Sequence, residues 1–292
     1  MTRRFKQVDV FTSHPLMGNP VAVVLDADGL DTARMQAFAH WTNLSETAFV
    51  LPPERGGDYR VRIFTPRSEL AFAGHPTLGA AHAVLEAGVL HPERTEFVQE
   101  CPAGALPLRV ETVGPERLLF VDAPPRSFRP IDDQHLDEIC TALDIPEVFG
   151  VRPMVVTLGP AWLVIDLGDA EAVASLTPRM SALASASNAM RITGVTVFGR
   201  ARSSTDAMLR VRSFAPAEGI AEDPVCGSGN VAVAAFLQET GLFDDVGTAY
   251  IANQGREVGR DGRVHVRIDP RAGRIQVGGA ALTCIDGVVR DA

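Results

Sequence analysis

Short apolar runs separated by turn residues dominate the first half of this chain, and such runs predict β-strands. The predicted strands of this half cover residues 5–11, 20–25, 45–51, 59–64, 95–98, 106–111 and 118–122. A helical spacing replaces this pattern after Asp31, which suits the position before a first helical turn. The apolar face of that predicted helix carries Met35, Phe38, Ala39 and Thr42.

Two stretches are apolar on nearly all sides when they are placed on a helix, one after Gly74 and one after Gly229. A helix of this kind is buried rather than amphipathic. Residues 264–268 alternate apolar with polar positions, as a half-buried strand does. Each half therefore predicts a curved, mainly antiparallel, barrel-like sheet around one central helix, an α+β fold without regular βαβ alternation.

The chain repeats itself once. Residues 61–66 read VRIFTP, and residues 211–216 read VRSFAP 150 positions later. Each motif is followed by a short loop, a glycine and an alanine-rich stretch, and an offset of 153 aligns Gly74 with Gly227. A period this long indicates a duplicated domain rather than a solenoid.

The duplication predicts two similar lobes related by pseudo-twofold symmetry. We expect the first lobe over residues 1–124, with a C-terminal strand at 281–292 as a candidate completion. The proline-rich residues 125–131 form the expected linker, and the second lobe covers 132–280. A chain of this length can bury a core without disulfides or a structural metal.

Composition narrows the possible partners. The chain carries 27 basic and 36 acidic residues among 292, a net charge of −9, which argues against nucleic acid and anionic membrane. No secretory signal or membrane span is recognisable, so we expect a cytoplasmic protein. Four cysteines without a CxxC pair, and no dinucleotide or Walker motif, give no sign of a metal or nucleotide cofactor.

Both central helices begin in glycine-containing turns, Ala73-Gly74-His75-Pro76 and Cys226-Gly227-Ser228-Gly229. The first N–H groups of a helix lack partners within it, and the helix dipole adds positive potential there. If the lobes pack about a pseudo-twofold axis, the two starts face one cleft suited to a carboxylate substrate. Two ordinary glycine turns are the alternative interpretation.

Five side chains near these turns are candidates for chemistry. Glu46 lies at a predicted helix-to-strand junction beside apolar residues, and partial burial would raise its pKa as a general acid/base requires; otherwise it is a solvated helix-end carboxylate. Asp223 is a site residue or a turn residue before proline, and Ser228 is a helix cap, a ligand of substrate or both. His75 is a cap, a core histidine or a donor, and Cys226 is a core residue or a thiol whose pKa the helix start lowers.

At these residues the sequence resembles the PhzF-like isomerase family of phenazine biosynthesis, within the diaminopimelate-epimerase fold. The resemblance spans both halves and rests on MGNPVAVV, NLSETAFVL, AGHPTLGAA and APAEGIAEDPVCGSGN. It implies a two-lobed molecule with the site between the lobes, proton transfer without a cofactor, and a homodimer.

The resemblance also implies roles for individual residues. Glu46 stands where the family has its proton-shuttling carboxylate. Substrate-binding positions match Gly74, His75, Asp223, Gly227 and Ser228. The epimerases of this fold use two opposed thiols, but here only Cys226 matches, because Ala73 stands at the first position.

Three functions remain open from the sequence. The first is a cofactor-independent isomerase that moves a proton between carbons of a small carboxylic acid, with Glu46 as general acid/base. The second is a one-thiol epimerase or racemase that uses Cys226 against Glu46. The third is a non-catalytic protein that binds a small acid.

Overall fold

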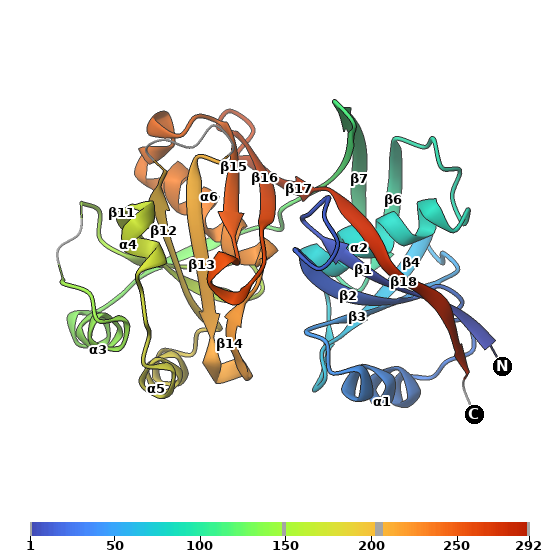
Figure 1. The fold of residues 1–292 in the computed structure, drawn as a ribbon, viewed down its shortest axis with the longest axis horizontal. Coiled ribbons are helices and arrows are strands. Elements are labelled where there is room, and N and C mark those ends of the chain that lie inside the picture. Colours follow the sequence, from blue (N-terminus) through green and yellow to red (C-terminus); the bar gives the residue numbers. More distant parts are fainter. Residues whose placement is uncertain (1, 148–149, 202–206, 291–292) are drawn as a thin grey trace. The chain divides into compact units, whose positions relative to one another are not determined.

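The computed structural model describes residues 2–147, 150–201 and 207–290, which form the predicted α+β fold. The chain divides into two compact units (Figure 1). Unit 1 is Met1–Asp122 with Gly278–Ala292, and unit 2 is Ala123–Val277. Each unit is a mainly antiparallel sheet around one buried helix, so the two units are alike in architecture.

Unit 1 encloses helix α2. Its elements are β1 (Thr2–Val10), β2 (Asn19–Val24), α1 (Thr32–Thr42), β3 (Thr47–Leu51), β4 (Tyr59–Phe64), β5 (Glu69–Leu70), α2 (Gly74–Glu86), β6 (Glu96–Cys101), β7 (Gly104–Val113), β8 (Glu116–Asp122) and β18 (Ala281–Arg290). Only the β2–β3 and β4–β6 pairs are parallel among the strand pairs described within this unit. Helix α2 packs against β1, β2, β3, β4, β8 and β18, which explains why its sequence is apolar on all sides.

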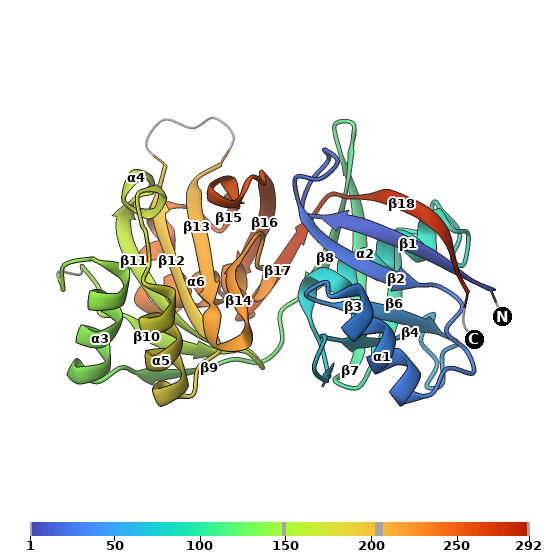
Figure 2. The same cartoon turned by 60° about the horizontal axis from the view of Figure 1, so that its bottom comes forward.

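Unit 2 repeats this plan around helix α6 and adds outer helices. Its elements are β9 (Ser127–Pro130), α3 (Asp133–Leu143), β10 (Met154–Thr157), β11 (Ala161–Asp169), α4 (Ala170–Ala174), α5 (Met180–Met190), β12 (Gly194–Arg200), β13 (Leu209–Ala215), η1 (Pro216–Glu218), β14 (Ile220–Asp223), α6 (Gly227–Thr240), η2 (Leu242–Asp245), β15 (Ala249–Gln254), η3 (Arg256–Val258), β16 (Gly262–Asp269) and β17 (Arg274–Gly279). The last two residues of β17 belong to unit 1. Helix α6 packs against β10, β11, β12 and β16. Helices α3 and α5 lie side by side on the outside of this unit (Figure 2).

The duplication extends to strand register. Strand β4 pairs with β6 in parallel with Tyr59 opposite Gln99. Strand β13 pairs with β15 in parallel with Leu209 opposite Ala252, and the offsets of 150 and 153 make these pairs equivalent. The three extra residues that change the offset fall in the turn between β13 and β14, which contains η1. A turn at the surface tolerates an insertion that a strand or a buried helix would not.

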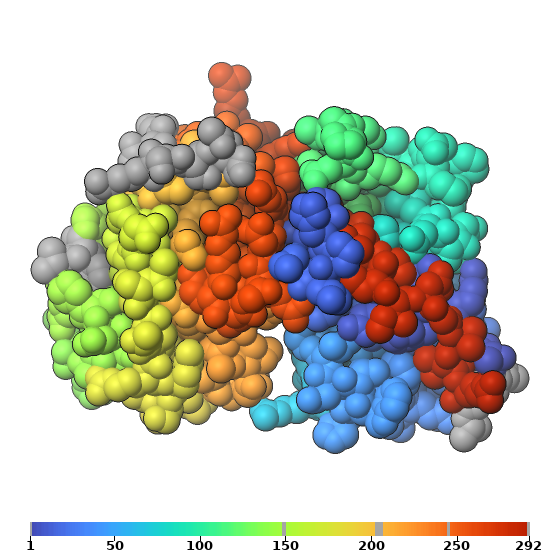
Figure 3. Space-filling view, in the orientation of Figure 1, coloured from blue at the N-terminus to red at the C-terminus, as the bar shows by residue number. Residues whose placement is uncertain are grey.

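The ends of the chain and the predicted linker both contribute strands. Residues 125–131, expected as a linker, contain β9, which pairs with β10 of unit 2. Strand β18 pairs with β1 from Thr2 opposite Arg290 to Val10 opposite Ala281, and it runs over the surface of unit 1 as a red band in Figure 3. Among the described residues, no helix has both the length and the apolar character needed to cross a bilayer.

Candidate functional site

Glu46 lies in the loop between α1 and β3, directly before the first residue of the strand. The α1 helix ends at Asn43, which adopts a left-handed conformation and turns the chain toward β3. The Glu46 side chain is 17% exposed. Burial raises its carboxyl pKa from 4.5 to about 7, although a hydrogen bond with Ser45 acts in the opposite direction. A carboxyl group with this pKa gives up and takes back a proton at neutral pH.

His75 lies beside this carboxyl group. It is the second residue of α2, it is buried, and its Nε2 lies 3.5 Å from Oε2 of Glu46. Two chain segments about 30 residues apart thus bring a carboxyl group and an imidazole together at the start of a central helix. The arrangement supplies one group that exchanges a proton and a second that can hydrogen-bond the same ligand.

The start of α2 is open at Gly74. Its N-cap residue, Ala73, has no side-chain hydrogen bond to the helix, and a Cβ placed on Gly74 would meet no atom within 4 Å. The N-cap residue of α2 therefore supplies no side-chain hydrogen bond to the first turn of the helix. Such a helix start suits the binding of an anionic group.

The start of α6 is capped by a thiol. Cys226 is the N-cap residue, and its Sγ accepts a hydrogen bond from the Gly229 N–H at 3.2 Å. Burial, followed by the charge of Asp223, raises the pKa of this thiol well above its usual value. Of the two interpretations of Cys226, its burial agrees with a core residue. The raised pKa disagrees with a thiol whose pKa the helix start lowers, because the loss of hydration outweighs the hydrogen bond from the helix.

Of the two roles predicted for Ser228, the helix cap is wrong, because Cys226 is the N-cap residue of α6. The helix begins at Gly227, so Ser228 lies inside the first turn. The indole Nε1–H of Trp162, on β11, donates to Oγ of Ser228 at 3.0 Å. Because an indole nitrogen only donates, the Ser228 hydroxyl is the acceptor here. Oγ of Ser228 also lies 3.5 Å from Sγ of Cys226, to which it can donate its hydrogen. Trp162 is not among the residues that the sequence predicts for the site, and no motif around it signals this contact.

Asp223 ends β14 and is fixed by the turn that follows. Its Oδ1 accepts the Val225 N–H at 3.1 Å, and its backbone oxygen accepts Nε2 of Gln254 at 3.0 Å. Gln254 in turn accepts Nδ2 of Asn230 at 2.8 Å. Both amide side chains are almost completely buried, so their hydrogen bonds fix the loop before α6 from the protein interior.

The structure thus gathers the candidate residues into two sets. Glu46, Gly74 and His75 meet at the start of α2 in unit 1. The set at the start of α6 in unit 2 consists of Asp223, Cys226, Gly227 and Ser228. Within residues 2–147, 150–201 and 207–290, no group of three or more His, Cys, Asp or Glu side chains is arranged to hold a metal ion.

The sequence and the fold match one family of known proteins. The family model described as "Phenazine biosynthesis-like protein" (PhzC-PhzF) matches residues 8–287. The chain therefore belongs to this family, and the family resemblance seen in the sequence is confirmed. The class that the fold and the relatives define is that of the isomerases.

Three particular proteins illustrate the similarity. The trans-2,3-dihydro-3-hydroxyanthranilate isomerase of Pseudomonas fluorescens is 33% identical, and the match covers 97% of each chain. A Schizosaccharomyces pombe protein named Antisense-enhancing sequence 1 is 38% identical, again over 97% of each chain. The crystal structure of the Bacillus anthracis phenazine biosynthesis protein of the PhzF family shares the fold, with a TM-score of 0.84 and 24% identity over the full length of both chains.

Proposed function

We propose that this isomerase moves a proton between two carbons of a small carboxylic acid, with Glu46 as the general acid/base. The observation that carries the proposal is the buried Glu46 carboxyl group, whose pKa is raised to about 7 beside His75. A group whose pKa lies near the working pH is the most effective proton shuttle. The relatives named trans-2,3-dihydro-3-hydroxyanthranilate isomerase support an acid of this general kind as substrate.

In the proposed reaction, Glu46 transfers one proton and His75 helps to hold the substrate. The ionised carboxyl group removes a proton from a carbon that a neighbouring conjugated group makes acidic. The electron pair moves through the conjugated system, and the protonated carboxyl group returns the proton to another carbon. No electron is gained or lost, so the proposal needs no redox cofactor.

The helix starts have the complementary role of binding the substrate carboxylate. The proposal assigns Gly74, Gly227 and Ser228 to this role through backbone N–H groups and the Ser228 hydroxyl, and it assigns Asp223 to orientation of the substrate. Loss of an oriented donor of this type typically costs about 10²–10³-fold in rate.

Deuterium incorporation tests the proposal. We would incubate the protein in D₂O with a panel of small conjugated and cyclic acids, including 2,3-dihydro-3-hydroxyanthranilate, and detect exchange by mass spectrometry. We expect at least one acid to gain carbon-bound deuterium with the wild type and none with Glu46→Gln. The matched control is Glu100→Gln, since the Glu100 carboxylate is also buried but accepts N–H groups of Glu54, Arg55 and Gly57. Unchanged exchange in Glu46→Gln would refute the assigned role.

A variant of Cys226 distinguishes the proposed isomerase from the one-thiol epimerase. The raised pKa of Cys226 disfavours a thiolate base, although the hydrogen bond from the Gly229 N–H acts in the opposite direction. We therefore expect Cys226→Ser, which keeps a capping oxygen, to retain exchange. Loss of exchange in Cys226→Ser with retention in Glu46→Gln would instead support a one-thiol epimerase. Binding of an acid without any exchange would support a non-catalytic binding protein.

The proposal also includes a homodimer, which the family resemblance supports. Sedimentation equilibrium tests this directly, because a dimer has twice the 31.2 kDa mass of the chain.

A further inference from the structure

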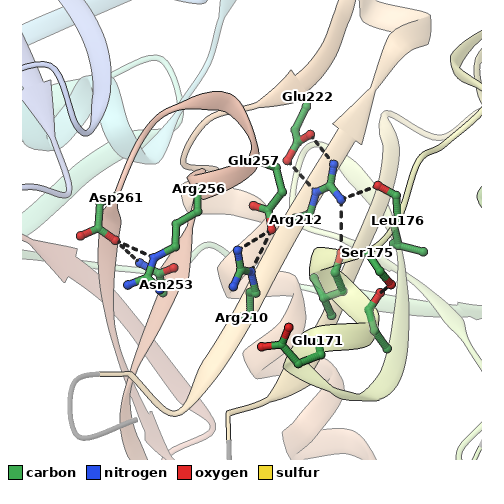
Figure 4. Close-up of polar contacts among 12 residues, drawn as sticks. Glu171, Ser175, Leu176, Arg210, Arg212, Glu222, Asn253, Arg256, Glu257 and Asp261 are labelled. Carbon is green, nitrogen blue, oxygen red and sulfur yellow. Dashed lines mark hydrogen bonds and ion pairs between the residues drawn. The ribbon is translucent and has the colours of Figure 1, made fainter.

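Arg212 and Glu222 form a buried, bidentate ion pair in unit 2 (Figure 4). Nε and Nη2 of Arg212 donate to the two Glu222 carboxylate oxygens at 2.9 and 2.8 Å, and each side chain is only 6% exposed. Nη1 donates to the backbone oxygens of Val173 and Leu176 at the end of α4. One arginine therefore joins β13, β14 and the α4 segment.

Unit 1 contains a bidentate arginine–glutamate ion pair at the equivalent positions. Nε and Nη2 of Arg62 donate to the two Glu69 oxygens at 2.7 Å each, and Nη2 also donates to Thr32 at the start of α1. The offsets of 150 and 153 relate Arg62 to Arg212 and Glu69 to Glu222. Both guanidinium groups also lie over the phenylalanine two residues further along their strand, at 5.1 Å in unit 1 and 4.9 Å in unit 2.

The location of each pair links it to a helix start. Glu222 is followed directly by Asp223 and, four residues later, by the cap residue Cys226. Successive side chains of a strand point to opposite faces, so fixing Glu222 on one face fixes Asp223 on the other. In unit 1, Glu69 begins the short strand β5 that leads to Gly74 and His75. Strand β5 has only two residues and β14 only four, too few for strand pairing alone to hold them firmly.

We propose that Arg212 with Glu222, and Arg62 with Glu69, are positioning residues that fix the substrate-binding helix starts of the two units. The bidentate geometry sets both the distance and the rotation of β14 and β5 relative to their neighbouring strands. That these helix starts bind a substrate rests on the proposed function. The placement of the loops before them can be measured without any substrate.

Amide hydrogen exchange of the full chain, followed by mass spectrometry of peptides, tests the proposal. We expect Glu222→Gln and Arg212→Met to raise exchange rates at least tenfold in residues 223–230. We expect Glu69→Gln to do the same in residues 70–78, with a smaller increase because its pair is 21% and 29% exposed. Unchanged exchange at 223–230 in Glu222→Gln would overturn the proposal.

A double variant separates positioning from stability. Replacing both partners by apolar residues, in Arg212→Met with Glu222→Leu, removes the buried unpaired charge that each single change leaves. We expect this variant to recover part of the melting temperature lost in the single variants, since the donors to Val173 and Leu176 remain absent, while exchange at 223–230 stays fast. Recovery of both together would show that the pair acts only on stability.

The neighbouring pair Arg210–Glu257 provides the matched control. Arg210 lies on β13, as Arg212 does, and its Nη2 is 2.6 Å from Oε1 of Glu257. This pair joins β13 to η3 rather than to β14 (Figure 4). We expect Arg210→Met to raise exchange at 255–260 and to leave 223–230 unchanged. An increase at 223–230 of the same size as in Arg212→Met would contradict a specific role for the Arg212–Glu222 pair. Failure of the deuterium assay described above would remove the isomerase assignment but would leave these exchange results to stand or fall separately.

Discussion

At the scale of single residues, Glu46 combines a functional advantage with a cost in stability. Its carboxyl group loses hydration in the folded state, which raises its pKa from 4.5 to about 7. The folded protein therefore binds a proton more tightly than the unfolded chain, and its free energy of unfolding falls as the pH rises between these values. The same burial that places the proton shuttle near neutrality destabilises the ionised protein.

The pH dependence of stability should reveal this cost. Glu46→Gln replaces the carboxyl group by a neutral amide of the same shape, so the two proteins should have similar unfolding free energies near pH 4. Above pH 8 we expect the variant to be more stable by up to about 3 kcal/mol, at about 1.4 kcal/mol for each unit of pKa. Urea unfolding at both pH values measures the difference. A wild type more stable than the variant at pH 8 would mean that the ionised carboxylate is stabilised rather than penalised.

At the scale of elements, the two buried helices depend on close contacts with the strands around them. A Cβ on Gly79 would lie 2.3 Å from Cγ1 of Val21, so α2 approaches β2 more closely than any other residue type at this position allows. The equivalent position in α6 is Ala232, which is completely buried. The residue that determines how closely the helix approaches its sheet therefore differs between the two units, glycine in α2 and alanine in α6.

Gly79→Ala tests this contact. Alanine has the higher helix propensity, but we expect the collision with Val21 to dominate and to destabilise the protein by about 1–3 kcal/mol. Gly74→Ala is the matched control for stability, because a Cβ there meets no atom within 4 Å. Chemical denaturation of both variants gives the comparison. Equal stability of the two would show that the helix shifts without cost.

The sequence predicted the elements better than it predicted the contacts of the site. Asp31 does cap α1, where its side chain accepts the Arg34 N–H, and the two buried helices begin at the glycine turns expected for them. These features depend on local pattern. The contacts of Ser228 with Trp162 and of Glu46 with His75 depend on how distant segments pack, which no local pattern determines. The repeat did carry one further signal, because Arg62 and Glu69 recur as Arg212 and Glu222 at the same offsets.

At the scale of the whole molecule, unit 1 is completed by residues from the end of the chain. Strand β18 pairs along the length of β1, contacts α2, and places Asp286 2.7 Å from the buried ammonium group of Lys6. Lys6 also contacts Glu86 near the end of α2, at 2.8 Å. Since β18 follows unit 2 in sequence, unit 1 is complete only after both unit 2 and residues 281–290 have been synthesised.

Deletion of residues 281–292 should therefore affect the two units unequally. We expect hydrogen-exchange protection to be lost across β1 and α2, because β1 loses a partner strand and Lys6 loses one of its carboxylates. Protection in α6 should persist. Val288→Ala, at an exposed position of the same strand, serves as the control and should change neither unit. Equal loss of protection in both units would contradict this division.

The titration of Glu46 itself tests the central claim most directly. Carbon NMR of protein labelled with ¹³C in the glutamate carboxyl groups follows each group through pH, and the resonance that is missing in Glu46→Gln identifies residue 46. The account predicts a midpoint near 7 for this resonance. A midpoint near 4.5, the value of an ordinary solvated glutamate, would show that the carboxyl group is not poised to exchange a proton at neutral pH.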